Sequence, residues 1–151
     1  MAWNDTKSSG DLISSSDWNT MVSDQESRLG TTAATISGDV AIGGHAGFIN
    51  EYTVSPLETT TIDWTNGNKA AMSMTVSPST VAFTNPPRAS NLILRISQDG
   101  TGSRTVSTWD TDIKWADGSA PTLSTAASAI DIISFYFDGS KYYGVASTNF
   151  S

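Results

Sequence analysis

Two stretches near the end of the chain decide the fold: residues 91–97 read NLILRIS, and residues 130–147 read IDIISFYFDGSKYYGVAS. In the first stretch Leu92, Leu94 and Ile96 alternate with other side chains, so the period is two, as in a β-strand. The second stretch has the same period from residue 130 to residue 137. One of its faces is predicted to carry Ile130, Ile132, Ser134 and Tyr136, and the other Asp131, Ile133, Phe135 and Phe137.

The dipeptide Asp138-Gly139 follows this strand directly, and an aromatic run that begins at Tyr142 comes next. Asp-Gly between two β-rich runs is a strong hairpin signal, because glycine adopts the positive φ that tight turns require. We therefore predict a hairpin here and assign both strands to the core sheet.

Short β patterns continue upstream, each ended by glycine, proline or asparagine. Asn66-Gly67 predicts a second hairpin turn. Strands at a spacing of about 8–12 residues are typical of all-β domains. The sequence therefore predicts an antiparallel β-sandwich or jelly roll of about eight strands. The upstream strands are expected at residues 48–54, 59–64, 72–76, 81–83, 105–108 and 112–115.

The N-terminal part has a different pattern. Residues 1–11 are polar apart from one tryptophan, and residues 12–30 predict one short helix whose apolar side chains gather in its first two turns. An apolar patch this small does not stabilise an isolated helix. The helix must therefore dock on its own domain, on a neighbouring subunit or on a larger assembly. The residues predicted to anchor the chain or line a subunit interface are Trp3, Ile13, Trp18, Met21 and Val22.

Residues 31–47 are rich in glycine, alanine and threonine and poor in large side chains. Such a segment forms no core of its own, so we interpret it as a neck or linker. The predicted organisation is an arm and anchoring helix (1–30), the neck (31–47) and a β-sandwich head (48–151).

Composition excludes several functions. The chain has no cysteine and a single histidine, His45, so thiol chemistry and zinc sites built from cysteine are excluded. The net charge of -7 argues against binding the phosphates of nucleic acids. No apolar run approaches the ~20 residues of a membrane span, so no membrane insertion is expected.

We find no pair of carboxylates placed for acid–base catalysis, and we expect a protein that is not an enzyme and takes no cofactor. Asp99, Asp110, Asp112 and Asp117 have two interpretations. They are either ligands of a calcium site or turn residues that bond their own backbone, and the second is favoured. Arg95, on an otherwise apolar strand, is predicted to pair with Asp131.

Four aromatic residues are candidates for glycan contact: Trp109, Trp115, Tyr142 and Tyr143. An aromatic face on a β-sandwich can stack against a sugar ring, and neighbouring Asp or Asn side chains can accept the sugar hydroxyls. Aromatic residues on strands are more often core or subunit interface, so that alternative stays open.

Several segments resemble a module found at the C-terminal end of tail-fibre and other virion surface proteins of tailed viruses. They are TIDWTNGN (61–68), FTNPP (83–87), LILRISQDGTGSRTV (92–106) and IKWADGSAPTLSTAASAIDIISFYFDGSKYYGVAS (113–147). Residues 3–30 resemble the N-terminal segments of similar proteins in viruses of archaea and bacteria. The resemblance implies a β-sandwich head, usually trimeric, displayed on the particle, and it supplies no catalytic residues.

We therefore expect a virion structural protein on the outer surface of the particle. Its expected form is a homotrimeric tail fibre or spike that binds other virion proteins through its N-terminal segment and displays its head for host attachment. One alternative is a capsid decoration protein that stabilises the head shell. An alternative of another class is a glycan-binding adhesin module whose partner is a host surface glycan.

Overall fold

The computed structural model describes Ser16, Asn19, Ser23 and residues 51–150. The chain divides into two units, Met1–Ala46 and Gly47–Ser151. Ser16, Asn19 and Ser23 have α-helical backbone and exposed side chains. The remainder of the predicted helix and the whole predicted neck lie outside the described residues.

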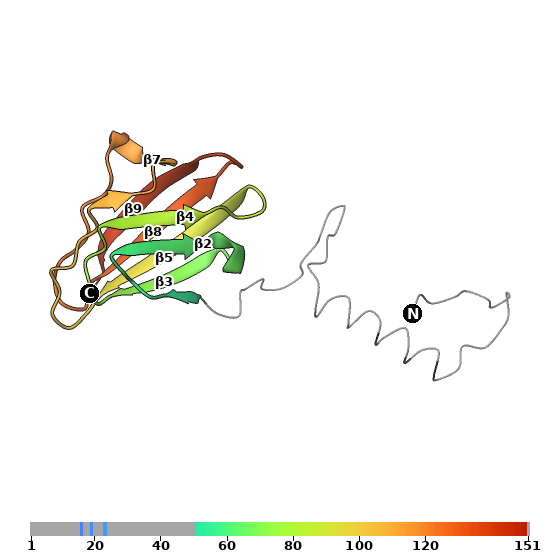
Figure 1. Cartoon of the computed structure of the whole chain (residues 1–151), viewed down its shortest axis with the longest axis horizontal. Helices are drawn as coiled ribbons and strands as arrows, with labels where there is room; N and C mark the ends of the chain where they lie inside the picture. Colours follow the sequence, from blue (N-terminus) through green and yellow to red (C-terminus); the bar gives the residue numbers. More distant parts are fainter. Residues whose placement is uncertain (1–15, 17–18, 20–22, 24–50, 151) are drawn as a thin grey trace. The chain divides into compact units, whose positions relative to one another are not determined.

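The unit from Gly47 is built from nine described strands and two short 3-10 turns (Figure 1). The turns are η1 (Trp64–Asn66) and η2 (Ala116–Gly118). The strands are β1 (Tyr52–Val54), β2 (Thr59–Asp63), β3 (Lys69–Met74), β4 (Thr80–Thr84), β5 (Ser90–Gln98), β6 (Thr108–Trp109), β7 (Ile113–Trp115), β8 (Ile130–Phe137) and β9 (Tyr142–Phe150). The prediction of an all-β head is therefore confirmed.

The strands form two sheets. One has six strands in the order β1-β3-β5-β8-β9-β7, and the other has three in the order β2-β4-β6. Of the pairs among the described strands, only β5–β8 and β8–β9 are antiparallel, and the other five are parallel. The antiparallel arrangement predicted for the whole domain is therefore wrong for most of it.

The first six strands explain the parallel pairs. The chain enters the six-stranded sheet at β1, crosses to the other sheet at β2, returns at β3, and continues this alternation as far as β6. Each strand therefore lies beside the strand two places later in the sequence: Tyr52 is beside Ala70, and Thr59 is beside Thr80. We call β1 to β6 the wound half.

The turn at Asn66-Gly67 follows from this winding. It joins β2 to β3, which belong to different sheets, so the predicted hairpin there is wrong. The Asp63 carboxylate caps η1 instead, accepting a hydrogen bond of 3.0 Å from the Thr65 amide. The turn residues mark a change of direction correctly, but they do not specify which sheet the next strand joins.

The predicted hairpin at Asp138-Gly139 is confirmed. Strands β8 and β9 are antiparallel, with Phe137 opposite Tyr142 at the turn. Gly139 has a φ of 105°, and the Asp138 carboxylate accepts hydrogen bonds from the amides of Ser140 (2.7 Å) and Lys141 (2.8 Å). We call β8 and β9 the hairpin half.

The core lies between the two sheets. Leu92, Leu94 and Ile96 of β5 are buried, as the alternation predicts. The same holds for β8, where every second side chain from Asp131 to Phe137 is buried. In Figure 1, β2 and β4 lie over β5 and β8. The sheets meet through aromatic rings: Phe83 of β4 lies 5.2 Å from Phe135 of β8 and 4.9 Å from Tyr142 of β9, centroid to centroid.

The predicted partner of Arg95 is wrong. Its guanidinium donates two hydrogen bonds to Oε2 of Glu51, at 3.0 and 2.7 Å. Arg95 stands opposite Ile132 on the outward side of the six-stranded sheet, whereas Asp131 is buried on the inward side. Asp131 is the residue before Ile132, so Arg95 and Asp131 are near each other along their paired strands. Successive side chains of a strand point to opposite faces, so the two side chains lie on opposite sides of the sheet and cannot pair.

Candidate functional site

Two adjoining hollows open on the surface of the β unit. The first has a volume of about 270 Å³ and lies between residues 105–109 and the loop 120–125. The second has a volume of about 240 Å³ and lies between β7, η2 and β9. Pro121 lines both, so the two are neighbours on either side of one side chain. We call them the first and second pockets.

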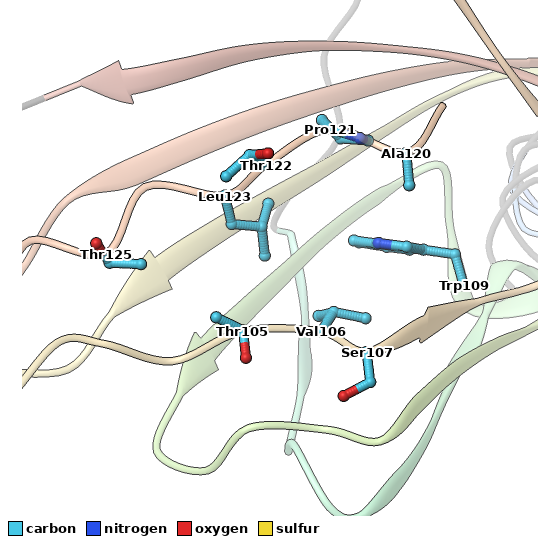
Figure 2. Close-up of a pocket in the computed structure, with 9 residues that line it drawn as sticks. All are labelled: Thr105, Val106, Ser107, Trp109, Ala120, Pro121, Thr122, Leu123 and Thr125. Atoms are coloured by element: carbon cyan, nitrogen blue, oxygen red, sulfur yellow. The ribbon is translucent and has the colours of Figure 1, made fainter. Parts of the chain in front are cut away.

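The first pocket has an apolar floor and is also lined by serine and threonine residues. Val106, Trp109 and Leu123 form the floor, and Figure 2 shows the Trp109 indole pointing into the space between the two segments. Trp109 is 8 % exposed, so only a small part of its surface reaches solvent. Thr105, Ser107, Thr122 and Thr125 also line this pocket, and in Figure 2 the hydroxyl groups of Thr105 and Ser107 point away from the Trp109 indole.

The second pocket is built around Trp115. Its ring centroid lies 5.3 Å from that of Trp109, in an edge-on arrangement, so the structure brings these two predicted residues together. Trp115 packs directly on the backbone of β9 at Gly144. A Cβ added there would lie 2.9 Å from Trp115 Cε3, closer than real Cβ contacts allow. A side chain at position 144 would therefore displace the Trp115 ring from β9.

Two buried polar side chains hold the loop 120–125, which lines the first pocket. Gln98 Nε2 donates to the carbonyl oxygens of Ser124 (2.8 Å) and Arg104 (2.9 Å). The Asp131 carboxylate accepts hydrogen bonds from the backbone amide and the hydroxyl of Ser124, both at 2.7 Å. Because buried hydrogen bonds to backbone groups are costly to break, this pair keeps the loop in one position.

The lining of the pockets carries little charge. Neither pocket is lined by a lysine, arginine or histidine, and Asp117 is the one charged residue in either lining. Asp117 is exposed and has a φ of 59°, a conformation that aspartate tolerates better than most residues. The linings of both pockets therefore consist mostly of uncharged residues.

The other two predicted glycan contacts lie elsewhere. Tyr142 has no exposed surface, packs in the core and donates a hydrogen bond of 2.6 Å to Oδ1 of Asn85. Burial raises the pKa of its phenol. A residue without exposed surface offers no face to a sugar, so Tyr142 has a core role. Tyr143 is 49 % exposed and stacks on Tyr136, on the outward side of the six-stranded sheet.

That outward side is apolar over part of its area. Tyr136, Tyr143 and Val145 are each about half exposed, and Ile93 and Ile132 are half-buried beside them. Cross-strand pairs place Tyr136 opposite Tyr143, and Ser134 opposite Val145. We call this surface of β5, β8 and β9 the outer face.

Two of the four aspartates predicted as calcium ligands, Asp99 and Asp110, accept hydrogen bonds from amides of their own turns. Asp99 accepts hydrogen bonds from the amides of Thr101 and Gly102, and its other oxygen pairs with Arg104. Asp110 accepts from the amides of Phe83 and Asp112. Asp112 pairs with Lys141, and this hydrogen bond raises the pKa of the lysine. These bonds support the turn interpretation.

Within residues 51–150 and the three described helical residues, no group of three or more His, Asp or Glu side chains is placed to hold a metal ion. Over the same residues, no helix has the length and apolar character to cross a membrane. The predicted anchor residues Trp3, Ile13, Trp18, Met21 and Val22 lie outside the described part of the chain.

Sequence reasoning missed the supports of the site. Gln98 continues the inward series Leu92, Leu94, Ile96, and Asp131 begins the inward series of β8. A polar residue at a core position of an alternating strand is a recognisable signal, because burial demands a partner for it. Pro121 and Gly144 gave no comparable signal, since their roles depend on which loops the fold brings together.

Comparison with known proteins places the chain in a family. The family described as "Putative phage tail fibre C-terminal domain" matches residues 50–142, which is more than half of the chain and covers most of the β unit. No curated protein and no solved structure matches the chain. The family match confirms the resemblance drawn from the motifs within residues 50–142, and the resemblance of residues 3–30 stays a prediction. The chain belongs to the phage tail fibre C-terminal domain family, and it is a structural protein at the surface of the virion tail.

Proposed function

We propose that this chain is the head of a homotrimeric, non-enzymatic tail fibre that attaches the virion to the host surface. The observation that carries the attachment role is the match to the tail-fibre family, on a domain whose surface has two adjoining pockets. An attachment protein needs a preformed surface that recognises chemistry outside the particle, and concave aromatic sites with a few polar groups are typical of such recognition.

The outer face supports the homotrimer, with further copies of this chain as its occupants. Tyr136, Tyr143 and Val145 are 51, 49 and 55 % exposed in the isolated chain, and contiguous exposed apolar surface marks interaction sites. The pair of Arg95 and Glu51 is partly exposed on the same side of the sheet, with side chains 38 and 33 % exposed. Where copies meet at the outer face, Arg95 of one copy can therefore pair with Glu51 of another, around the apolar centre.

Native mass spectrometry tests the trimer. The wild-type chain is expected at three times the protomer mass, and the double variant Tyr136→Ser/Tyr143→Ser at the protomer mass. Leu57→Ser is the matched control, because Leu57 is 65 % exposed but lies between β1 and β2. A wild-type monomer at micromolar concentration would refute the trimer.

The tail location and the attachment role have separate tests. Electron microscopy of virions labelled with an antibody to this chain should place the label on tail fibres. Label distributed over the head shell would favour the decoration alternative, which no present observation supports. Purified chain added to host cells should compete with virions for adsorption, and a chain that does not compete would contradict attachment.

The N-terminal anchor remains a prediction. We propose that residues 1–30 bind other virion proteins, because the expected helix carries too small an apolar patch to stand alone. Trp18→Ala and Met21→Ala in one chain should lower incorporation into virions. The β unit should keep its circular dichroism spectrum. Normal incorporation of that double variant would show that these side chains are not the anchor.

A further inference from the structure

We propose that Tyr52, Trp64 and Asn68 enclose a binding site for one structural water molecule, at the end of the β unit where β1 begins. The site is separate from the two pockets and does not depend on the attachment role. The water joins β1 to the turn η1, and it thereby fixes the strand through which residues 1–50 are connected to the β unit.

Each of these three side chains has one buried polar atom without a partner. The atoms are the Tyr52 hydroxyl oxygen, the Trp64 indole nitrogen and the Asn68 amide oxygen, and none of them has a hydrogen-bond partner among the described residues. Trp64 is 2 % exposed, so its N–H has no access to bulk solvent. Because a buried polar group without a partner is costly, native structures rarely contain one. Three in one place therefore indicate a shared partner.

The fold brings the three side chains to one corner. Tyr52 lies opposite Ala70 in the pair β1–β3, and Asn68 precedes Ala70 by two residues, so the strand period places both on the inward side of the sheet. The rings of Tyr52 and Trp64 meet edge-on, with centroids 6.2 Å apart. A Cβ added at Gly67 would lie 3.9 Å from Tyr52 Cδ1, an ordinary contact. The turn that carries Trp64 and Asn68 therefore folds beside the Tyr52 ring.

Water has the hydrogen-bonding capacity that these atoms require. The indole N–H only donates, the amide oxygen only accepts, and the phenol hydroxyl does either. One water molecule can therefore accept from Trp64, donate to Asn68 and bond to Tyr52 in either direction. Buried waters typically make about three bonds of this kind, and folded proteins hold about one buried water per 27 residues.

Larger or charged ligands do not suit the site. The three polar atoms are buried, so a ligand of several heavy atoms would have to displace the side chains. Burial raises the pKa of the Tyr52 phenol, and the nearby Asp63 carboxylate raises it further, so the hydroxyl stays neutral. The same carboxylate disfavours an anion. A calcium ion would need about six oxygen ligands, and the site offers two.

The water strengthens a strand that is otherwise short. Strand β1 has three residues, and β3 is its one neighbour among the described strands. On the outward side, Glu51 accepts two hydrogen bonds from Arg95 of β5. The water-bridged group fixes the strand from the inward side. A pull on residues 1–50 therefore reaches a strand that is held on both faces.

A high-resolution crystal structure of the full chain tests the site directly. It should show a water oxygen at hydrogen-bonding distance, roughly 2.7–3.2 Å, from the Trp64 nitrogen, the Asn68 oxygen and the Tyr52 hydroxyl. A well-ordered corner without that oxygen, or with a protein atom in its place, would overturn the proposal.

Tyr52→Phe gives a test in solution in which the sign of the effect decides. If water bridges the hydroxyl, its removal should raise the equilibrium constant for unfolding by about fivefold. If the hydroxyl is unpaired, its removal should lower that constant, because the cost of burying it disappears. Tyr142→Phe is the matched control, since the buried Tyr142 hydroxyl donates a hydrogen bond of 2.6 Å to Asn85. Both variants should therefore shift in the same direction in urea denaturation at one protein concentration.

The double variant Tyr52→Phe/Asn68→Leu tests whether the two groups share one partner. Each single change removes one bond to the water and loosens the others, so the second change should cost less than it does alone. If the two effects on the unfolding constant simply multiply, or if Tyr52→Phe lowers that constant, the three groups do not bind a common water and the proposal fails.

Discussion

The wound half and the hairpin half share one core but are connected in different ways. In the wound half, consecutive strands belong to different sheets, and each parallel neighbour lies two strands away in sequence. In the hairpin half, β8 and β9 follow each other, pair directly and place β8 between two antiparallel neighbours. A local turn therefore stabilises the hairpin half, whereas packing between segments distant in sequence stabilises the wound half.

This difference predicts where the β unit is strongest. Strand β8 is bonded along most of its length on both sides, by β5 and by β9. Strand β2 is an edge strand of the three-stranded sheet and pairs with β4 alone among the described strands. An edge strand can relax toward a cavity more easily than a strand held on both sides, so equal truncations should have unequal costs.

Ile133 and Ile62 provide the largest test, because both isoleucines are fully buried, one in each half. Ile133→Ala should lower the free energy of unfolding by about 4 kcal/mol, and Ile62→Ala by about 2.5 kcal/mol. Urea denaturation monitored by circular dichroism measures both. Equal losses, or a larger loss at Ile62, would show that the two halves do not differ in rigidity.

Gly102 tests the junction of the two halves. It has a φ of 71° in the loop after β5, and an added Cβ would lie 2.5 Å from the carbonyl oxygen of Thr125 in the loop before β8. Gly102→Ala should therefore cost about 3 kcal/mol, from the strained φ and from displacement of the facing loop.

Gly118 is the matched control for this change. It has a similar φ of 76°, but nothing lies within 4 Å of an added Cβ. Gly118→Ala should cost only the conformational strain, about 1 kcal/mol. The same urea experiment applies. If both variants lose equal stability, the close contact between the loops contributes nothing.

The two halves also explain what could be predicted from the sequence. The alternation in β5 and β8 and the turn at Asp138-Gly139 are local patterns, and they correctly predicted buried faces and a hairpin. Asn66-Gly67 carries an equally clear local signal, yet it joins strands of different sheets. Period and turn chemistry specify strands and reversals, but the partner of a strand depends on packing between distant segments.

The candidate site follows the same rule. Trp109 and Trp115 could be selected as aromatic residues near turns, but their residue types did not show that Trp109 and Tyr142 are buried whereas Trp115 is half-buried. Which aromatic residue reaches the surface depends on the register of β7 beside β9 and on the loop that Pro121 occupies. Those are long-range features that a single sequence does not specify.

Gln98 tests a polar link that joins the halves and supports the site. Gln98→Leu keeps the approximate volume but leaves the amide and carbonyl of Arg104 and the carbonyl of Ser124 without their partner. The expected loss is about 2 kcal/mol, the cost of part-buried unsatisfied groups. Differential scanning calorimetry should show a lower melting temperature.

Asn91→Leu is the control for Gln98→Leu, because it makes the same change at an exposed position of β5. Its melting temperature should stay close to that of the wild type. If Gln98→Leu melts like this control, the hydrogen bonds from Gln98 do not hold the loop.

Asp63 and Asp138 give the smallest and most finely matched comparison, since each caps a turn in a different half. Hydrogen bonds from Thr65 hold the pKa of Asp63 below its ordinary value, and hydrogen bonds from the amides of Lys141 and Ser140 do the same for Asp138. A carboxyl group whose pKa is lower in the folded state stabilises the fold above its unfolded pKa, near pH 4, and this contribution is lost as the pH falls through the folded pKa.

Urea midpoints measured between pH 5 and pH 2 should therefore fall on acidification, and less steeply in Asp63→Asn and Asp138→Asn. If the slope changes only in Asp138→Asn, the hairpin turn alone is stabilised by its carboxylate, and the turn of the wound half depends on packing.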